Sequence, residues 1–302
     1  MTEIQAYENL ANAIIIQAAR DYKKAYKILE ELVKVNYADS LELLGEFYYF
    51  DEKYDKALVT FKKAIKNKEN VYSNYMLGLM YAYGLGVDVD YTLAIKYLEI
   101  AIKKGDHNAM QELAHLYFNG YGVQANIYKA YELWDKAAKL GNSYGYANLG
   151  IIYCNGYPSY PKDYKKAFDY FKKAADMGNE FGKAHMANCY LTGNGVTKDY
   201  YKAYQIVNKS ELKNHFMLYV KGKMYYEGYG VAVNYDEAFK YFSRSIELSN
   251  KACKEALYYI GRCYYFGQGT NQDKDKAYEY MVLSKNLDYS LAENFIKEFY
   301  SK

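Results

Sequence analysis

The chain has 302 residues, of which 51% are hydrophobic and 25% are charged, and its formal net charge is +3. Such a composition excludes an intrinsically disordered chain, and the balanced charge lacks the basic excess of a nucleic-acid-binding surface. The sequence holds only 2 prolines but 42 tyrosines. Because tyrosine can bury its ring and keep its hydroxyl in water, we expect large half-buried surfaces.

The beginning of the chain predicts a cytoplasmic protein. Glu3 and Glu8 precede the apolar run at 13–16, which is too short for a signal peptide. No segment approaches the roughly 20 apolar residues that span a bilayer. We therefore expect a monomer in the cytoplasm that does not insert into membranes and does not bind nucleic acid.

One short pattern recurs along almost the whole chain. An alanine in a charged, tyrosine-containing segment returns every 32 to 39 residues, at Ala25, Ala57, Ala94, Ala130, Ala167, Ala203, Ala238 and Ala277. Seven residues later most copies carry a second small residue, from Ala64 to Ser284. Seven residues are close to two helical turns, so both small residues share one helix face and admit a close neighbour.

A second motif lies upstream of each of these helices. A large and a small residue, such as Leu77-Gly78, are followed three residues later by a tyrosine, in turn Tyr48, Tyr81, Tyr117, Tyr153, Tyr190, Tyr225 and Tyr264. This spacing places the three residues on one helical face. Each unit is therefore predicted to be a pair of helices.

A glycine-containing turn joins the two predicted helices. In 81–90, YAYGLGVDVD, Gly84 can adopt the left-handed conformation that ends a helix, and Asp90 stands where the next helix needs an N-cap. The same offsets predict caps at Asn126, Asp163, Asp199, Asn234 and Asp273. The valine or threonine after the second glycine, such as Val87, is expected to pack between the helices.

These motifs resemble the Sel1-like repeat, a relative of the tetratricopeptide repeat. The resemblance runs from about 71 to 273 and is carried by LGLMYAYGLGVDVDY and YKKAFDYFKKAADMGN. It implies an all-α, right-handed α/α solenoid of about eight helix-turn-helix repeats. It also implies one repeat domain over 1–302, with two short-loop repeats in 1–70, G-x-G-V loops in 71–273 and capping helices in 274–302.

Three segments depart from the pattern. The fifth loop replaces its second glycine by Pro158 and adds Pro161, which predicts a stiffer path. The sixth second helix, in 201–216, lacks the K-A-A-x-x-G ending, so we expect the stack to bend there. Lys221 replaces an expected leucine, for which the sequence offers only a lysine stem lying along the groove.

Motifs for catalysis and metal binding favour structural interpretations. The G-x-S-x-G match at 141–145 has no preceding strand, so Ser143 is predicted to cap a helix, and the G-x-G turns lack the remaining features of phosphate loops. Trp134 is expected in the core. The cysteines, Cys154, Cys189, Cys253 and Cys263, contain no C-x-x-C, and the histidines, His107, His115, His185 and His215, lack zinc spacing. We therefore expect buried thiols, structural histidines, and neither cofactor nor metal.

The resemblance places a partner on the concave surface lined by the first helices. The candidate residues are those that the motif leaves free: Glu42, Glu46, Tyr49, Tyr75, His115, Phe118, Asn119, Asn155, Asn188, Tyr219, Lys223, Tyr226, Arg262 and Tyr265. This series is acidic early, apolar in the middle and basic late, which suits a peptide with an apolar centre and oppositely charged ends. The alternative is an ordinary solvated face.

We therefore expect a non-catalytic scaffold or adaptor that binds a protein or peptide. A bacterial virulence or host-interaction factor that uses the same groove is the alternative, and a nucleic-acid-binding solenoid or an enzyme is less favoured.

Overall fold

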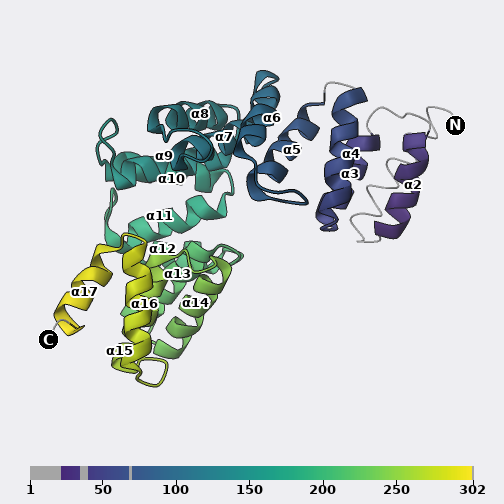
Figure 1. Cartoon of the computed structure of the whole chain (residues 1–302). Coiled ribbons are helices and arrows are strands. Elements are labelled where there is room, and N and C mark those ends of the chain that lie inside the picture. The colour runs from purple at the N-terminus through teal and green to yellow at the C-terminus, as the bar shows by residue number, and fades with distance from the viewer. Residues whose placement is uncertain (1–21, 35–39, 68–69, 301–302) are drawn as a thin grey trace. The chain divides into compact units, whose positions relative to one another are not determined.

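The computed structural model describes residues 22–34, 40–67 and 70–300, and Figure 1 shows an array of helices. Within these ranges the sixteen regular elements are all α-helices. They are α2 (Tyr22–Lys34), α3 (Ser40–Phe50), α4 (Tyr54–Asn67), α5 (Val71–Tyr83), α6 (Tyr91–Lys103), α7 (His107–Asn119), α8 (Ile127–Lys139), α9 (Ser143–Asn155), α10 (Tyr164–Asp176), α11 (Glu180–Thr192), α12 (Tyr200–Asn208), α13 (His215–Glu227), α14 (Tyr235–Leu248), α15 (Lys254–Phe266), α16 (Lys274–Asn286) and α17 (Ser290–Tyr300). The all-α repeat fold is confirmed. Glu3, Glu8 and the side chain of Ala25 lie outside the described residues.

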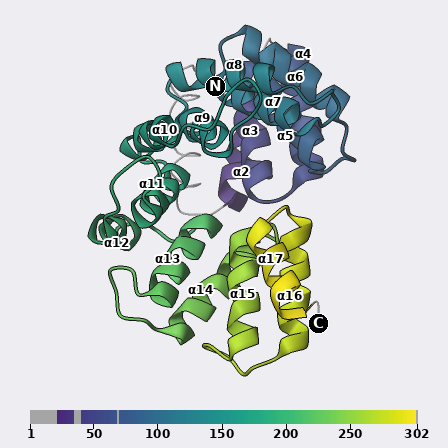
Figure 2. The same cartoon turned by 90° about the vertical axis from the view of Figure 1, so that its left-hand side faces the viewer.

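The helices form pairs in which an odd-numbered first helix precedes an even-numbered second helix, and the pairs form two compact units, 1–142 and 143–302. In the first unit Leu77 and Phe61 are fully buried, and in the second Met217 and Phe242 are. Both views show α13, α14, α15 and α16 side by side (Figures 1 and 2), which agrees with the packing of each on the next.

The repeated alanines lie on the second helices, where the described ones are 0–1% exposed. The second small residue is also buried in most pairs. Where it is serine its hydroxyl has a partner: Ser245 Oγ donates to the His215 carbonyl at 2.7 Å, and Ser284 Oγ donates to the Lys254 carbonyl at 2.7 Å. Ser245 and Ser284 therefore tie the second helix to the beginning of the first helix of the same pair, whereas Ser210 donates to the Ile206 carbonyl of α12.

Each loop in the pairs from α5–α6 to α15–α16 is closed by its predicted cap. Gly84 has a φ of 68° and ends α5, while the Asp90 carboxylate accepts from the Leu93 N–H at 2.9 Å and begins α6. The Asp90 N–H also donates to the Tyr81 carbonyl at 3.0 Å. The caps predicted at Asn126, Asp163, Asp199, Asn234 and Asp273 are all confirmed, and each repeats the bond to the motif tyrosine.

Much of the tyrosine excess serves these pairs. Tyr153 of α9 stacks on Tyr170 of α10 at 5.8 Å, and Lys166 Nζ donates to Tyr153 Oη at 2.7 Å. Equivalent ring stacks join Tyr81 to Tyr97, Tyr225 to Tyr241, and Tyr264 to Tyr280. We call this Tyr–Tyr contact, together with the bond from the cap, the repeat clasp.

The repeat clasp also explains Lys221. Its ammonium lies 4.9 Å from the centre of the Tyr241 ring, so it makes a cation–π contact with a tyrosine of the clasp. A leucine would fill the space without this contact.

The fifth loop keeps the expected end points despite its prolines. Tyr157 and Tyr160 exchange two backbone hydrogen bonds, of 2.8 and 2.9 Å, which place Pro158 in a tight turn. The Asp163 N–H still donates to the Tyr153 carbonyl at 2.9 Å. Ser143 is the first residue of α9, so its predicted capping role was wrong; its hydroxyl instead accepts from Asn179 Nδ2 at 3.1 Å.

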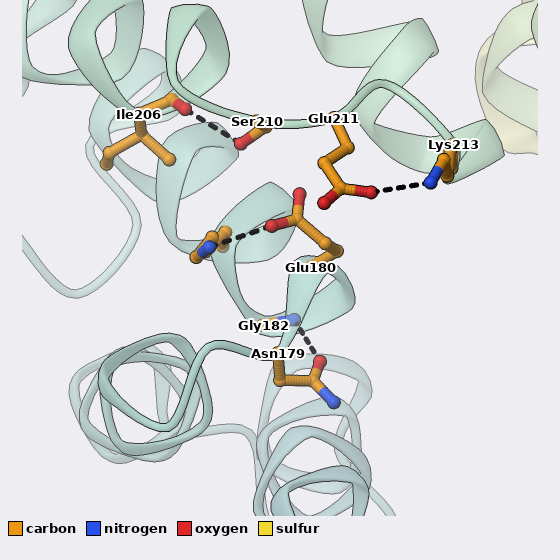
Figure 3. Close-up of polar contacts among 8 residues, drawn as sticks. Asn179, Glu180, Gly182, Ile206, Ser210, Glu211 and Lys213 are labelled. Carbon is orange, nitrogen blue, oxygen red and sulfur yellow. Dashed lines mark hydrogen bonds and ion pairs between the residues drawn. The ribbon is translucent and has the colours of Figure 1, made fainter. Parts of the chain in front are cut away.

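The sixth second helix is shorter than the others, with nine residues in α12. Ser210 Oγ donates to the Ile206 carbonyl at 2.8 Å, and the chain then continues through Glu211, which pairs with Lys213 at 2.8 Å (Figure 3). Asn179 caps the beginning of α11 through the Gly182 N–H in the same view. At this point α11 packs against α13.

Candidate functional site

Successive first helices approach one another within each unit. In the first unit α3 packs on α5 and α5 on α7, and in the second α9, α11, α13 and α15 follow the same order. Each second helix packs mainly on first helices. We therefore call the side formed by the first helices the inner face of each unit, and the two units are considered separately.

The candidates of the first unit lie on three first helices. Glu42, Glu46 and Tyr49 are on α3, Tyr75 is on α5, and His115, Phe118 and Asn119 are on α7. Asn119 is exposed and the others are half-buried. Burial raises the pKa of Glu46, and Glu42 accepts a hydrogen bond from Asn70 Nδ2.

The structure brings Tyr49 and Tyr75 to a carboxylate that the candidate list missed, Glu112. Tyr83 Oη donates to Glu112 Oε2 at 2.8 Å. Burial raises the pKa of Glu112. Burial, and then the Glu112 charge, raise the pKa values of Tyr75 and Tyr83, and the same charge acts on Tyr49. Because Glu112 precedes His115 by three residues on α7, the helical spacing could have identified it.

A hollow of about 290 Å³ opens beside this carboxylate. We call it the Glu112 pocket; Tyr83, Gln111, Glu112, His115, Asn119 and Tyr121 are among the residues that line it. Together with Tyr91, these residues place a carboxylate, an imidazole, two amides and three phenols at the surface of the first unit, which is an arrangement suited to binding.

His115 and Phe118 have a second role beneath this surface. Both rings contact Trp134 of α8, each at a centroid distance of 5.4 Å. Trp134 is 2% exposed, which confirms its predicted place in the core. Burial lowers the pKa of His115.

In the second unit the candidates differ in exposure. Asn155 is exposed, and Asn188, Lys223, Arg262 and Tyr265 are half-buried. The remaining two, Tyr219 and Tyr226, are buried at 3% and 5% exposure, so they support the inner face from within rather than offering contact area.

The charge of Arg262 is already compensated. Its guanidinium carbon lies 5.0 Å from the Tyr226 ring centre and 5.7 Å from that of Tyr259, and its Nη1 lies 3.6 Å from Glu227 Oε1. Tyr259 Oη donates to the same carboxylate at 3.1 Å. Burial lowers the pKa of Lys223. Arg262 therefore stabilises this cluster of side chains. The inner face of the second unit is less positive than the number of its basic residues indicates.

Tyr265 is covered by the last described helix. Its ring lies 5.2 Å from Phe295 and 5.1 Å from Phe299 of α17. This aromatic cluster packs α17 against α15 and leaves less of Tyr265 for a partner.

The described residues of the two inner faces form neither a disulfide nor a metal site. None of the four cysteines forms a disulfide, and Cys189, Cys253 and Cys263 are buried. Across the described ranges no group of three or more His, Cys, Asp or Glu side chains could hold a metal ion. No described helix has both the length and the apolar character needed to cross a bilayer.

The model of the Sel1 repeat matches six segments, 71–106, 107–142, 143–179, 182–211, 222–250 and 254–289. The chain belongs to the Sel1 repeat family. Its six Sel1 repeats correspond to the helix pairs from α5–α6 to α15–α16. Sel1 and related helical repeats generally mediate protein interactions, and the family is typically non-catalytic.

Solved structures share this fold of paired helices. One is c5321 of uropathogenic Escherichia coli, described as a protective antigen with an SLR fold; it is 26% identical, with a TM-score of 0.59 over 93% of this chain and 60% of its own. A Sel1 repeat protein of Oxalobacter formigenes is 23% identical, with a TM-score of 0.63 over 81% of this chain and 96% of its own. Yeast Tom70 is 19% identical, with a TM-score of 0.54 over 97% of this chain and 63% of its own.

This Sel1 repeat protein thus spans 60% of the length of the E. coli structure. No curated protein sequence matches it.

Proposed function

We propose that the chain is a non-catalytic scaffold that binds a protein or peptide through the inner faces of its units. This proposal rests on the difference in burial between two sets of positions within each first helix. Motif residues such as Leu77 and Leu149 are buried in the core, whereas inner-face positions such as Glu46 and His115 are only half-buried. A repeat built in this way keeps its fold while its inner face changes.

The chemistry of the inner faces supports recognition of protein. Half-buried tyrosines supply contact area at a small cost in side-chain entropy, and Asn119 and Asn155 add exposed amides. A catalytic site would require a sequestered pocket in which reactive groups converge. The Glu112 pocket is lined by a carboxylate, an imidazole, amides and phenols, and no serine, cysteine or lysine lies among its residues.

Selection of peptides from a random displayed library on the immobilised full chain tests the proposal. The Asn119→Arg variant places a long charged side chain on the inner face of the first unit, and Asn155→Arg does so in the second. Each variant should weaken the binding of the peptides selected on its unit at least about tenfold. The matched controls are Glu99→Arg in α6 and Gln205→Arg in α12, which are exposed on second helices. Failure to select any binder, or equal loss in the controls, would contradict the proposal.

A host-interaction role is a second candidate, supported by the similarity to a protein described as a protective antigen. Fractionation of the native cells separates it from a cytoplasmic adaptor. Retention of the protein with a cytosolic marker favours the adaptor, and its release into the medium while the marker stays inside favours the host-interaction role.

A further inference from the structure

Glu112 is a half-buried carboxylate with no cationic partner among the described residues. It accepts a single hydrogen bond, from Tyr83, and no lysine or arginine contributes to its electrostatic surroundings. Glu227 differs in this respect, because Arg262 Nη1 lies 3.6 Å from its Oε1 and compensates its charge. A carboxylate that loses water without gaining a positive charge is held at a cost in free energy, which a bound cation would offset.

Phenol rings from two helices lie near this carboxylate. Tyr49 comes from α3, and Tyr75 and Tyr83 come from α5. All three lie close enough to Glu112 for its charge to raise their pKa values. Tyr121 lines the same pocket, is 48% exposed and stacks on Tyr91 at 5.2 Å, so it presents a fixed ring at the rim.

We propose that the Glu112 pocket receives an arginine side chain of the protein partner, an inference that rests on the proposed function. A guanidinium supplies the missing positive charge, donates to the Glu112 oxygen that Tyr83 leaves open and lies against phenol rings. An ammonium fits less well because it is more strongly hydrated and lacks a planar face. The volume of about 290 Å³ is at the lower limit of small-molecule sites and suits one long side chain.

Nuclear magnetic resonance of the full chain, labelled on its tyrosine rings, tests the pocket directly. The probe is N-acetyl-arginine methylamide, and N-acetyl-citrulline methylamide is its uncharged analogue. We expect the arginine probe to shift the signals of Tyr83 and Tyr121 until the pocket is saturated. The citrulline probe should bind at least about tenfold more weakly. Tyr83→Phe and Tyr121→Phe assign the signals. Equal shifts with both probes would overturn the proposal.

The Glu112→Gln variant keeps an oxygen that accepts from Tyr83 but removes the charge. It should lose the response to the arginine probe, while Glu132→Gln, an exposed change on α8, should keep it. Unchanged binding by Glu112→Gln would refute the role of the carboxylate. If self-association of the chain, measured by analytical ultracentrifugation, disappears in Glu112→Gln, the pocket belongs to a second copy and the proposal is also overturned.

The peptides selected on the immobilised chain test the arginine pocket separately from the scaffold function. Binders of the first unit should share an arginine, and citrulline in its place should weaken them on the wild type but not on Glu112→Gln. Binders that ignore both changes would refute the arginine pocket and leave the scaffold function intact. Absence of any binder would refute the scaffold function itself.

Discussion

Replacing His185 by phenylalanine should make the second unit less sensitive to acid. The His185 ring stacks between Phe171 and Phe216, at centroid distances of 4.7 and 4.2 Å, and meets the edge of Phe181 at 4.4 Å. Its Nε2 has no hydrogen-bond partner among the described residues. These surroundings disfavour the imidazolium, so burial, with a smaller effect of His215, lowers the pKa of His185 to about 3.

The sign and size of the effect follow from proton linkage. The unfolded chain binds a proton at His185 with a pKa of about 6.5, whereas the folded chain binds it only near pH 3. The stability of the unit is therefore complete above about pH 6.5 and falls as the pH decreases. Between pH 8 and pH 5 this single group should cost about 2 kcal/mol of unfolding free energy.

Urea unfolding of the wild type and His185→Phe at pH 8 and pH 5 measures this cost. Circular dichroism follows both units, and the fluorescence of the single tryptophan, Trp134, follows only the first. The wild-type second unit should lose about 2 kcal/mol more than the variant between the two pH values, while the Trp134 transition shifts equally in both proteins. Equal losses in the second unit would refute the reasoning.

Two further changes test the packing of the repeats, with Tm and urea midpoints as the measurements. Gly195→Ala should lower the free energy of unfolding by more than about 3 kcal/mol, because φ is 75° and the new Cβ would lie 2.0 Å from the Tyr164 carbonyl oxygen. Gly178→Ala is the control: φ is 84° but no atom lies within 4 Å of the new Cβ, so the loss should be about 1 kcal/mol. The reverse order would contradict the close approach between repeats. Ser245→Ala removes a buried hydroxyl whose hydrogen bond to a carbonyl is 2.7 Å long and should cost about 1–3 kcal/mol, whereas the neighbouring Ser243→Ala should change stability by less than about 0.5 kcal/mol. Equal effects of the two serine changes would show that this bond contributes nothing.

The sequence predicted features that depend on local chemistry. Helix caps such as Asp90 and Asp273 were correct because a cap bonds to a backbone N–H three residues away. Ser143 was not predicted correctly because its hydroxyl bonds to Asn179, a residue 36 positions away that the local sequence does not indicate.

Features that join several helices could not be predicted in the same way. The partner of Lys221 is a tyrosine of another helix, and the Glu112 pocket is built from α5, the beginning of α6, α7 and the loop that follows α7. The burial of Tyr219 and Tyr226 likewise depends on the neighbouring helices. The candidate face remains a prediction. Helical spacing on α7 could have identified Glu112, but its partner Tyr83 on α5 became visible only in the structure.

The repeat clasp has a consequence for how such a chain can change. Tyr81 with Tyr97, and Tyr225 with Tyr241, close each clasp inside a single helix pair. A duplicated pair therefore contains its own repeat clasp and needs from its neighbours only a complementary helix surface. The chain can lengthen by whole pairs, and each new pair adds an inner-face segment whose side chains can diverge without weakening the repeat clasp.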